Sequence, residues 1–143
     1  MRSTRVFITY ILLYLSFQLI SSCRDYITDL GIGNQLKIST DKEVYGVYDT
    51  ITVTLTNNSA HTVYVKEIFS FIERRNQDNW DTYLNTSCGN CIESSLTTGN
   101  SLYYKGELVP SSGTFRLVCL YSLTPGTAEQ DKIKLYSNSF SVQ

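Results

Sequence analysis

The chain has 143 residues, of which 42% are hydrophobic and 17% are charged. This length fits one domain with little left over, which excludes a multidomain protein. The apolar fraction suffices for a core, which excludes a disordered chain. Twelve Lys and Arg residues against 13 Asp and Glu residues give a net charge of −1 without a basic block, and we therefore expect no nucleic-acid partner.

The N-terminus has the pattern of a sorting signal. Arg2 and Arg5 precede an uncharged run of 15 residues from Val6 to Ile20. As a helix this run would rise about 22 Å, which is less than the roughly 30 Å of a hydrocarbon core. A positive start followed by a short apolar run is typical of a signal peptide rather than of a membrane-spanning helix.

The apolar run ends in Ile20-Ser21-Ser22-Cys23, which resembles the lipobox of bacterial lipoproteins. The resemblance implies that residues 1–22 are a lipoprotein signal peptide and that Cys23 becomes the first mature residue, carrying a thioether-linked lipid. Two or three acyl chains anchor a protein durably to a bilayer. An ordinary secretory signal cut near Ser22 and an uncleaved signal anchor are the alternatives.

Residues 23–35 are expected to form a lipid-anchored tether, because Gly31, Gly33 and Asn34 interrupt any regular pattern. The membrane, reached through the lipid, is therefore one expected partner, and the cell envelope is the expected location. In enterobacterial lipoproteins an aspartate directly after the cysteine retains the protein at the inner membrane. Here Arg24 occupies that position, which favours the outer membrane if the host is Gram-negative.

Residues 36–143 are rich in Thr, Ser, Tyr, Val and Asn, and apolar residues recur at every second position, as in β-strands. The clearest example is TITVTLTN over residues 50–57, where Ile51, Val53 and Leu55 face one side and threonines face the other. This pattern fits a sheet with one face in the core and one in water. Residues 36–39, LKIS, are expected to form the preceding strand.

The next two strands are expected to form a hairpin. Residues 62–75 are predicted to form one long strand with a bulge or bend near Lys66, where the alternation of apolar residues changes phase. Residues 76–79, NQDN, predict a polar turn, after which alternation resumes over residues 80–84.

Further strands are expected over residues 101–108, 114–122 and 132–142. Tyr103 and Tyr104 must point to opposite faces of their strand. In TFRLVCLYS, residues 114–122, four side chains share one face: Phe115, Leu117, Cys119 and Tyr121. About seven short strands at even spacing predict an all-β sandwich.

Six segments follow one another in a characteristic order: LKIS at 36–39, Val44-Tyr45, ITVTLTNNS at 51–59, the expected hairpin ending at Trp80, GTFRL at 113–117 and YSNSFSV at 136–142. Over residues 36–142 this order resembles bacterial immunoglobulin-like domains of cell-envelope lipoproteins. The resemblance implies an immunoglobulin-like β-sandwich over residues 36–143 and an envelope location, but no active site, because the family has no common catalytic residue. The chain departs from antibody domains in that Cys119 has no cysteine partner on the facing strand.

Cys88-Gly89-Asn90-Cys91 has the CxxC spacing of redox sites, but no helical periodicity follows it. Outside the cytoplasm, a disulfide that closes this loop is the simpler interpretation. Metal binding, thiol–disulfide exchange and a different cysteine pairing remain open. If Cys88 pairs with Cys91, Cys119 is left as a buried apolar thiol.

No catalytic set can be assembled around His61, the single histidine, which we expect in an exposed turn. Calcium on the oxygens of Asp78, Asn79 and Asp81 remains open, although no recognised loop motif is present. We expect no enzyme activity, no resident metal and no cofactor.

The leading hypothesis is a non-enzymatic, lipid-anchored envelope protein whose sandwich binds another envelope component, either a protein or a glycan. Thiol–disulfide exchange at Cys88 and Cys91 is one alternative. A small immunoglobulin-like protease inhibitor that acts through exposed loops is the other.

Overall fold

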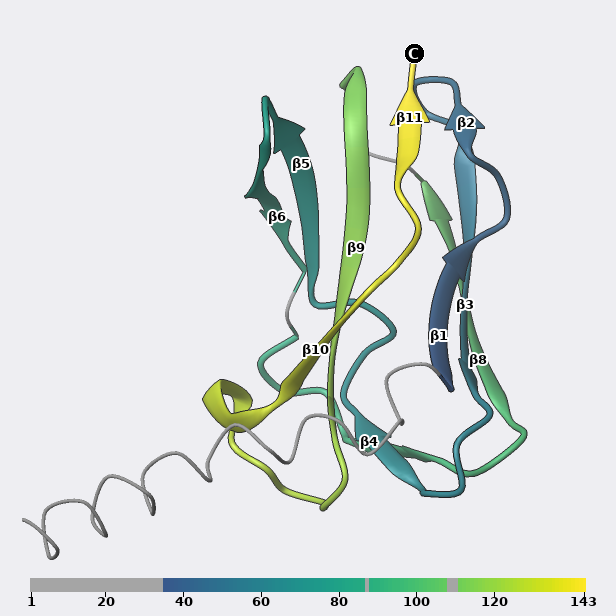
Figure 1. Cartoon of the computed structure of the whole chain (residues 1–143), viewed down its shortest axis with the longest axis vertical. Coiled ribbons are helices and arrows are strands. Elements are labelled where there is room, and N and C mark those ends of the chain that lie inside the picture. Colours follow the sequence, from purple (N-terminus) through teal and green to yellow (C-terminus); the bar gives the residue numbers. More distant parts are fainter. Residues whose placement is uncertain (1–34, 87, 108–110) are drawn as a thin grey trace, which may run out of the picture. The chain divides into compact units, whose positions relative to one another are not determined.

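The computed structural model describes residues 35–86, 88–107 and 111–143 (Figure 1). The expected signal peptide, Cys23 and the tether up to Asn34 lie outside these residues. Among the residues that are described, no helix is long and apolar enough to cross a membrane.

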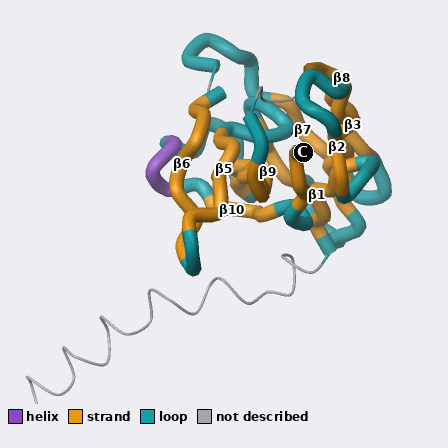
Figure 2. Tube along the Cα trace, turned by 90° about the horizontal axis from the view of Figure 1, so that it is seen from above, coloured by secondary structure: helices purple, strands orange, loops and turns teal. Residues whose placement is uncertain are grey.

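One layer of the fold is a three-stranded antiparallel sheet. It consists of β1 (Leu36–Thr40), β3 (Thr50–Asn57) and β8 (Ser101–Glu107), in the order β1-β3-β8. The central strand β3 pairs with β1 on one side and, from Thr50 to Thr56, with β8 on the other. Figure 2 shows these three strands grouped on one side of the domain.

The second layer is an eight-stranded sheet built around β9 (Gly113–Ser122), which pairs with β4, β5, β10 and β11. The main path runs β2-β11-β9-β4-β7, while β6 extends the sheet beyond β5. A short 3-10 helix, Glu129–Asp131, precedes β10. The remaining strands are β2 (Val44–Tyr45), β4 (Val63–Val65), β5 (Phe71–Asn76), β6 (Asn79–Asn85), β7 (Ser94–Leu96), β10 (Ile133–Tyr136) and β11 (Phe140–Val142).

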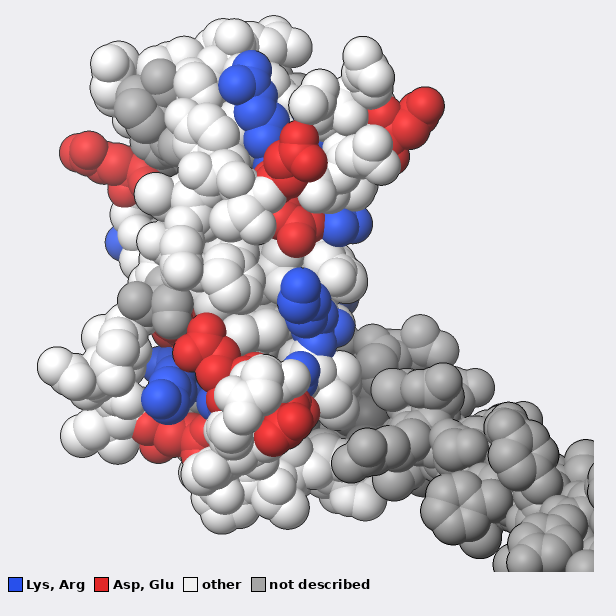
Figure 3. All heavy atoms as spheres, turned by 90° about the vertical axis from the view of Figure 1, so that its left-hand side faces the viewer, with Lys and Arg blue, Asp and Glu red and all other residues white. Residues whose placement is uncertain are grey.

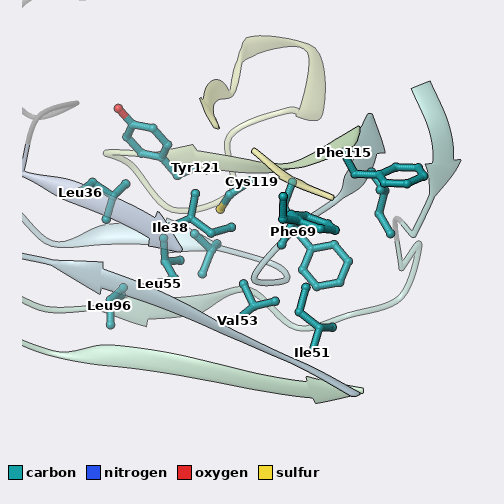
Figure 4. Packing of buried hydrophobic residues seen from close by; sticks show 14 of the residues in the cluster. Leu36, Ile38, Ile51, Val53, Leu55, Phe69, Leu96, Phe115, Cys119 and Tyr121 are labelled. Atoms are coloured by element: carbon teal, nitrogen blue, oxygen red, sulfur yellow. The ribbon is translucent and has the colours of Figure 1, made fainter. Parts of the chain in front are cut away.

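The core lies between the two sheets, as the alternation in β3 predicts. The apolar residues Ile51, Val53 and Leu55 of β3 are buried, whereas the threonines between them are partly exposed. From the other sheet, Phe115 and Cys119 are also fully buried in the same cluster (Figure 4). The expected all-β, immunoglobulin-like sandwich is confirmed.

The expected single strand over residues 62–75 is two strands, β4 and β5. Residues 66–70 leave the ladder between them, and the amide of Ser70 rejoins the sheet by donating to the carbonyl of Val118 at 2.7 Å. The excursion turns Phe69 into the core, where its ring meets Tyr104 edge-on at 5.1 Å. The change of phase near Lys66 therefore marks a break in the sheet rather than a bulge.

Residues 132–142 likewise form two strands, and both pair with β9. Between them, Ser137 accepts a hydrogen bond from the amide of Leu117 through its side chain at 2.9 Å, and its own amide donates to the Leu117 carbonyl at 3.0 Å. Such side chain–backbone bonds compete with ladder pairing. With these two breaks and the short strands β2 and β7, the described residues contain eleven strand segments rather than about seven.

The predicted hairpin is present as β5 and β6. Its two-residue turn is Gln77-Asp78, with Gln77 in the left-handed region at φ 54°. The register shifts between Ile72 and Glu73, so that one residue of β6 is left over as a bulge.

Candidate functional site

The predicted disulfide between Cys88 and Cys91 is confirmed. The two cysteines lie in the connection between β6 and β7, where Gly89 and Asn90 form an exposed turn. The amide of Cys91 donates to the carbonyl of Cys88 at 3.4 Å across this turn. We refer to residues 88–93 as the stapled loop.

Glu67 holds the first end of the stapled loop. The amide of Cys88 donates to the two carboxylate oxygens of Glu67, at 3.1 and 3.3 Å. Just before the loop, Thr86 donates through its hydroxyl to the carbonyl of Phe69 at 2.9 Å. The segment that leaves the sheet after β4 therefore supplies the anchor for this end of the loop.

Glu93 fixes the second end of the stapled loop. One of its carboxylate oxygens lies 2.9 Å from the ammonium of Lys132, and the other accepts the amide of Gly126 at 2.7 Å. The Lys132 side chain is only 2% exposed and that of Glu93 15%. The Gly126 amide and the Lys132 ammonium hold the pKa of the Glu93 carboxyl below its ordinary value.

Ile92 stands between these two anchors with 88% of its surface exposed. Its neighbour Cys91 is fixed by the disulfide and its neighbour Glu93 by the ion pair. An aliphatic side chain is thus displayed in water on a loop whose backbone is restrained on both sides. Sequence reasoning missed this arrangement because Glu67 and Lys132 are far from the loop in the chain.

The geometry around Cys88 does not favour thiol–disulfide exchange. Redox cysteines gain thiolate character from a helix N-terminus or a nearby cation. Here residues 88–93 form a turn followed by irregular chain, and the carboxylate of Glu67 accepts a hydrogen bond from the Cys88 amide. A negative charge at this position opposes the thiolate that exchange requires.

Cys119 is a free, fully buried thiol, as the sequence predicts. Burial raises the pKa of its thiol to about 12, so the thiol is protonated and unreactive near neutral pH.

His61 lies in an exposed turn, also as predicted. Its carbonyl accepts a hydrogen bond from the buried side chain of Asn57 at 2.8 Å. Within residues 35–86, 88–107 and 111–143, no group of three or more His, Cys, Asp or Glu side chains is placed to hold a metal ion. Of the calcium candidates, Asp81 accepts a hydrogen bond from Asn76 at 3.1 Å.

A second feature that sequence reasoning missed is a stacked group on the outer face of the larger sheet. The guanidinium of Arg116 lies 4.4 Å from the ring centre of Trp80 and 4.1 Å from that of Tyr136. It also forms an ion pair with Glu73 at 2.7 Å. Alternation along β9 places Arg116 opposite to the core residues, but only the sheet order brings the two rings to it. The group joins three strands, β6, β9 and β10, across one face.

Basic and acidic side chains are interspersed on the face shown in Figure 3, without a broad area of one sign. No protein-family model matches the chain, and no curated protein matches it. The site must therefore be interpreted from its own geometry.

Proposed function

We propose that the protein is a non-enzymatic, lipid-anchored component of the bacterial cell envelope that binds another envelope protein through the stapled loop. The anchoring part of the proposal rests on the lipobox-like Ile20-Ser21-Ser22-Cys23. The binding part rests on one observation, the display of Ile92 at 88% exposure between two fixed neighbours.

The restraints act on the shape of the loop as well as on the stability of the fold. None of the described residues from 88 to 95 is buried in the core. A disulfide that spans so few residues stabilises a fold only by about 2 kcal/mol on loop-entropy grounds, less than one that closes a long loop. The restraints have a clearer effect on shape, because they hold the backbone on both sides of Ile92.

A defined loop shape favours binding to a partner. A loop that is already ordered loses little conformational entropy when it binds, so more of the contact energy appears as affinity. Burial of an isoleucine side chain in an apolar pocket contributes roughly 2 kcal/mol. This chemistry favours a protein partner with an aliphatic pocket over a glycan, whose surface is dominated by hydroxyl groups.

The anchoring part is tested by intact-mass measurement on protein isolated from native membranes. The expected mass is that of residues 23–143 plus acyl chains, and the Cys23→Ser variant is expected to leave the membrane fraction. An unmodified mass would overturn the proposed location without affecting the binding part.

The binding part is tested by photo-cross-linking in intact cells, with the photoreactive residue at position 92 of the full-length protein. Tyr48, which is 72% exposed on a different turn, is the matched control position. The protein cross-linked from position 92 is then purified, and its affinity is measured for wild type and for Ile92→Ala. A loss of at least about tenfold is expected, equivalent to 1.4 kcal/mol. Equal affinity of the two forms would reject the role of Ile92.

The exposed Ile92 on its restrained loop also favours a second candidate function, that of a protease inhibitor. A residue displayed in this way is a suitable contact for the cleft of an enzyme. The wild-type protein would then slow at least one member of a protease panel, and Ile92→Asp would not. Failure to slow any protease would leave the envelope partner as the proposal.

A further inference from the structure

Strand β8 forms the open edge of the three-stranded sheet. It pairs with β3 through seven consecutive residues, from Ser101 opposite Thr56 to Glu107 opposite Thr50, without a register shift. In the strand order β1-β3-β8, no described strand lies on its other side. The backbone groups on that side are therefore available to pair with another strand.

The other edges within the described ranges are less suited to strand pairing. Strand β6 is as long as β8, but its pairing with β5 is interrupted by a register shift. Strands β1, β2, β7 and β10 have five residues or fewer. Natural edge strands are commonly shortened or bulged in this way to prevent association; β8 is neither short nor bulged, and the lysine that such edges often carry is present as Lys105.

The side chains of β8 divide between the two faces of its sheet. Tyr104 faces the core side, since it is paired with the buried Val53 and its ring meets Phe69. That ring also lies over Gly106, where a Cβ atom would collide with it. Tyr103 points to the outer face and is 71% exposed. Lys105 shares the outer face with Tyr103, because residues two apart along a strand point to the same side.

We propose that two copies of the chain associate edge to edge through antiparallel pairing of β8, with Tyr104 of each copy opposite Tyr104 of the other. Residues opposite one another in a continuous sheet must share a face, so the two-fold axis must pass through a residue position. An axis at Tyr104 pairs all seven residues of the strand, whereas an axis at Tyr103 or Lys105 pairs only five.

Charge selects the same register. With the axis at Tyr104, each Lys105 lies opposite the Tyr103 of the other copy, an arrangement that permits two symmetric cation–π contacts. With the axis at Lys105, the two ammonium groups would be directly opposed, which is destabilising. The β8 edge is therefore self-complementary, as a two-fold interface requires.

The first test is the association state of the full-length protein in detergent, measured by sedimentation over a range of concentrations. Wild type is expected to dimerise. Tyr103→Lys places a lysine opposite each Lys105 and is expected to weaken association at least tenfold. Tyr103→Lys combined with Lys105→Glu restores opposite charges across the pair and is expected to restore the dimer. Tyr48→Lys, at an equally exposed position outside β8, is expected to have no effect.

The second test determines the register. A Tyr103→Cys protein and a Lys105→Cys protein, carrying different tags, are mixed and oxidised. The mixed cross-link between positions 103 and 105 is expected to exceed both symmetric cross-links.

A monomeric wild type, a dimer that Tyr103→Lys does not weaken, or a double variant that fails to reassociate would overturn the proposal. Dominance of the symmetric cross-link between two 105 positions would also overturn it. Thermal unfolding of each variant verifies that the fold is kept, which is expected because Tyr103 is mostly exposed.

Discussion

The sandwich core and the stapled loop are held in different ways. In the core, β3 and β9 oppose apolar side chains such as Val53 and Phe115, both fully buried. In the stapled loop, a disulfide and the part-buried contacts of Glu67 and Glu93 fix the backbone on both sides of the exposed Ile92. The core supplies stability through area removed from water, and the loop receives a defined shape from a few directional bonds.

This difference predicts that a substitution in the core lowers the stability of the whole domain. Phe115 is fully buried, stacks on Phe140 and meets Tyr83 edge-on. Phe115→Ala leaves a cavity in this cluster and is expected to lower the free energy of unfolding by about 4 kcal/mol. Urea unfolding measures the loss, and Phe115→Leu is the control, with an expected loss below about 1.5 kcal/mol. A loss of less than 1 kcal/mol for the alanine variant would contradict this packing.

The largest effect at the loop is expected from removal of its part-buried ion pair with Lys132. Glu93→Ala leaves the ammonium of Lys132, 2% exposed, without its partner and is expected to cost about 3 kcal/mol. The double variant Glu93→Ala with Lys132→Met, measured in the same way, is expected to recover part of this loss because no buried charge is then left unpaired. A double variant less stable than Glu93→Ala would show that the unpaired Lys132 ammonium does not destabilise the fold.

The ion pair also predicts a dependence on pH. Because the pKa of Glu93 is lowered in the folded protein, its ionised form stabilises the fold above the ordinary glutamate pKa, and this stability is lost as the pH falls through the folded-state value. The difference in unfolding free energy between wild type and Glu93→Gln is therefore expected to shrink from pH 7 toward pH 3. A difference that grows on acidification would have the wrong sign.

A smaller effect on stability is expected from the disulfide. Cys88→Ser with Cys91→Ser is expected to lower the free energy of unfolding by about 2 kcal/mol or less, because the closed loop is short. The same variant should increase amide hydrogen exchange selectively in residues 88–93, while the amides of β3 remain protected. Equal acceleration in both segments would show that the disulfide supports the whole fold and not the loop alone.

The smallest effect is expected at Cys119, whose thiol is buried and has a pKa of about 12. An alkylating reagent at pH 7.5 is expected to leave Cys119 unmodified in the native protein and to label it after unfolding in denaturant. Mass spectrometry counts the added groups. Rapid labelling of the native protein would place this thiol outside the core.

Local patterns were sufficient to predict the parts of the fold in which each residue's face follows from its neighbours. The alternation in residues 50–57 and 114–122 predicts β3 and β9 and their buried faces, because side chains alternate along any strand. The Cys88–Cys91 disulfide could also be predicted from the sequence, since the two cysteines are only three residues apart. An irregularity near Lys66 was predicted, but the division into two strands there and the break after Tyr136 were missed, because Phe69 and Ser137 find their partners on other strands.

Contacts between distant segments were decided by the tertiary structure alone. Glu67 reaches Cys88 across 21 positions and Lys132 reaches Glu93 across 39. The stacking of Arg116 between Trp80 and Tyr136 depends on the order of strands in the sheet. By itself, the sequence determined which faces are apolar, because periodicity is a local property of the chain. Which segments meet was decided by the order of the strands in each sheet and by how the two sheets pack, and the tertiary structure thereby created both the restrained display of Ile92 and the open edge at β8.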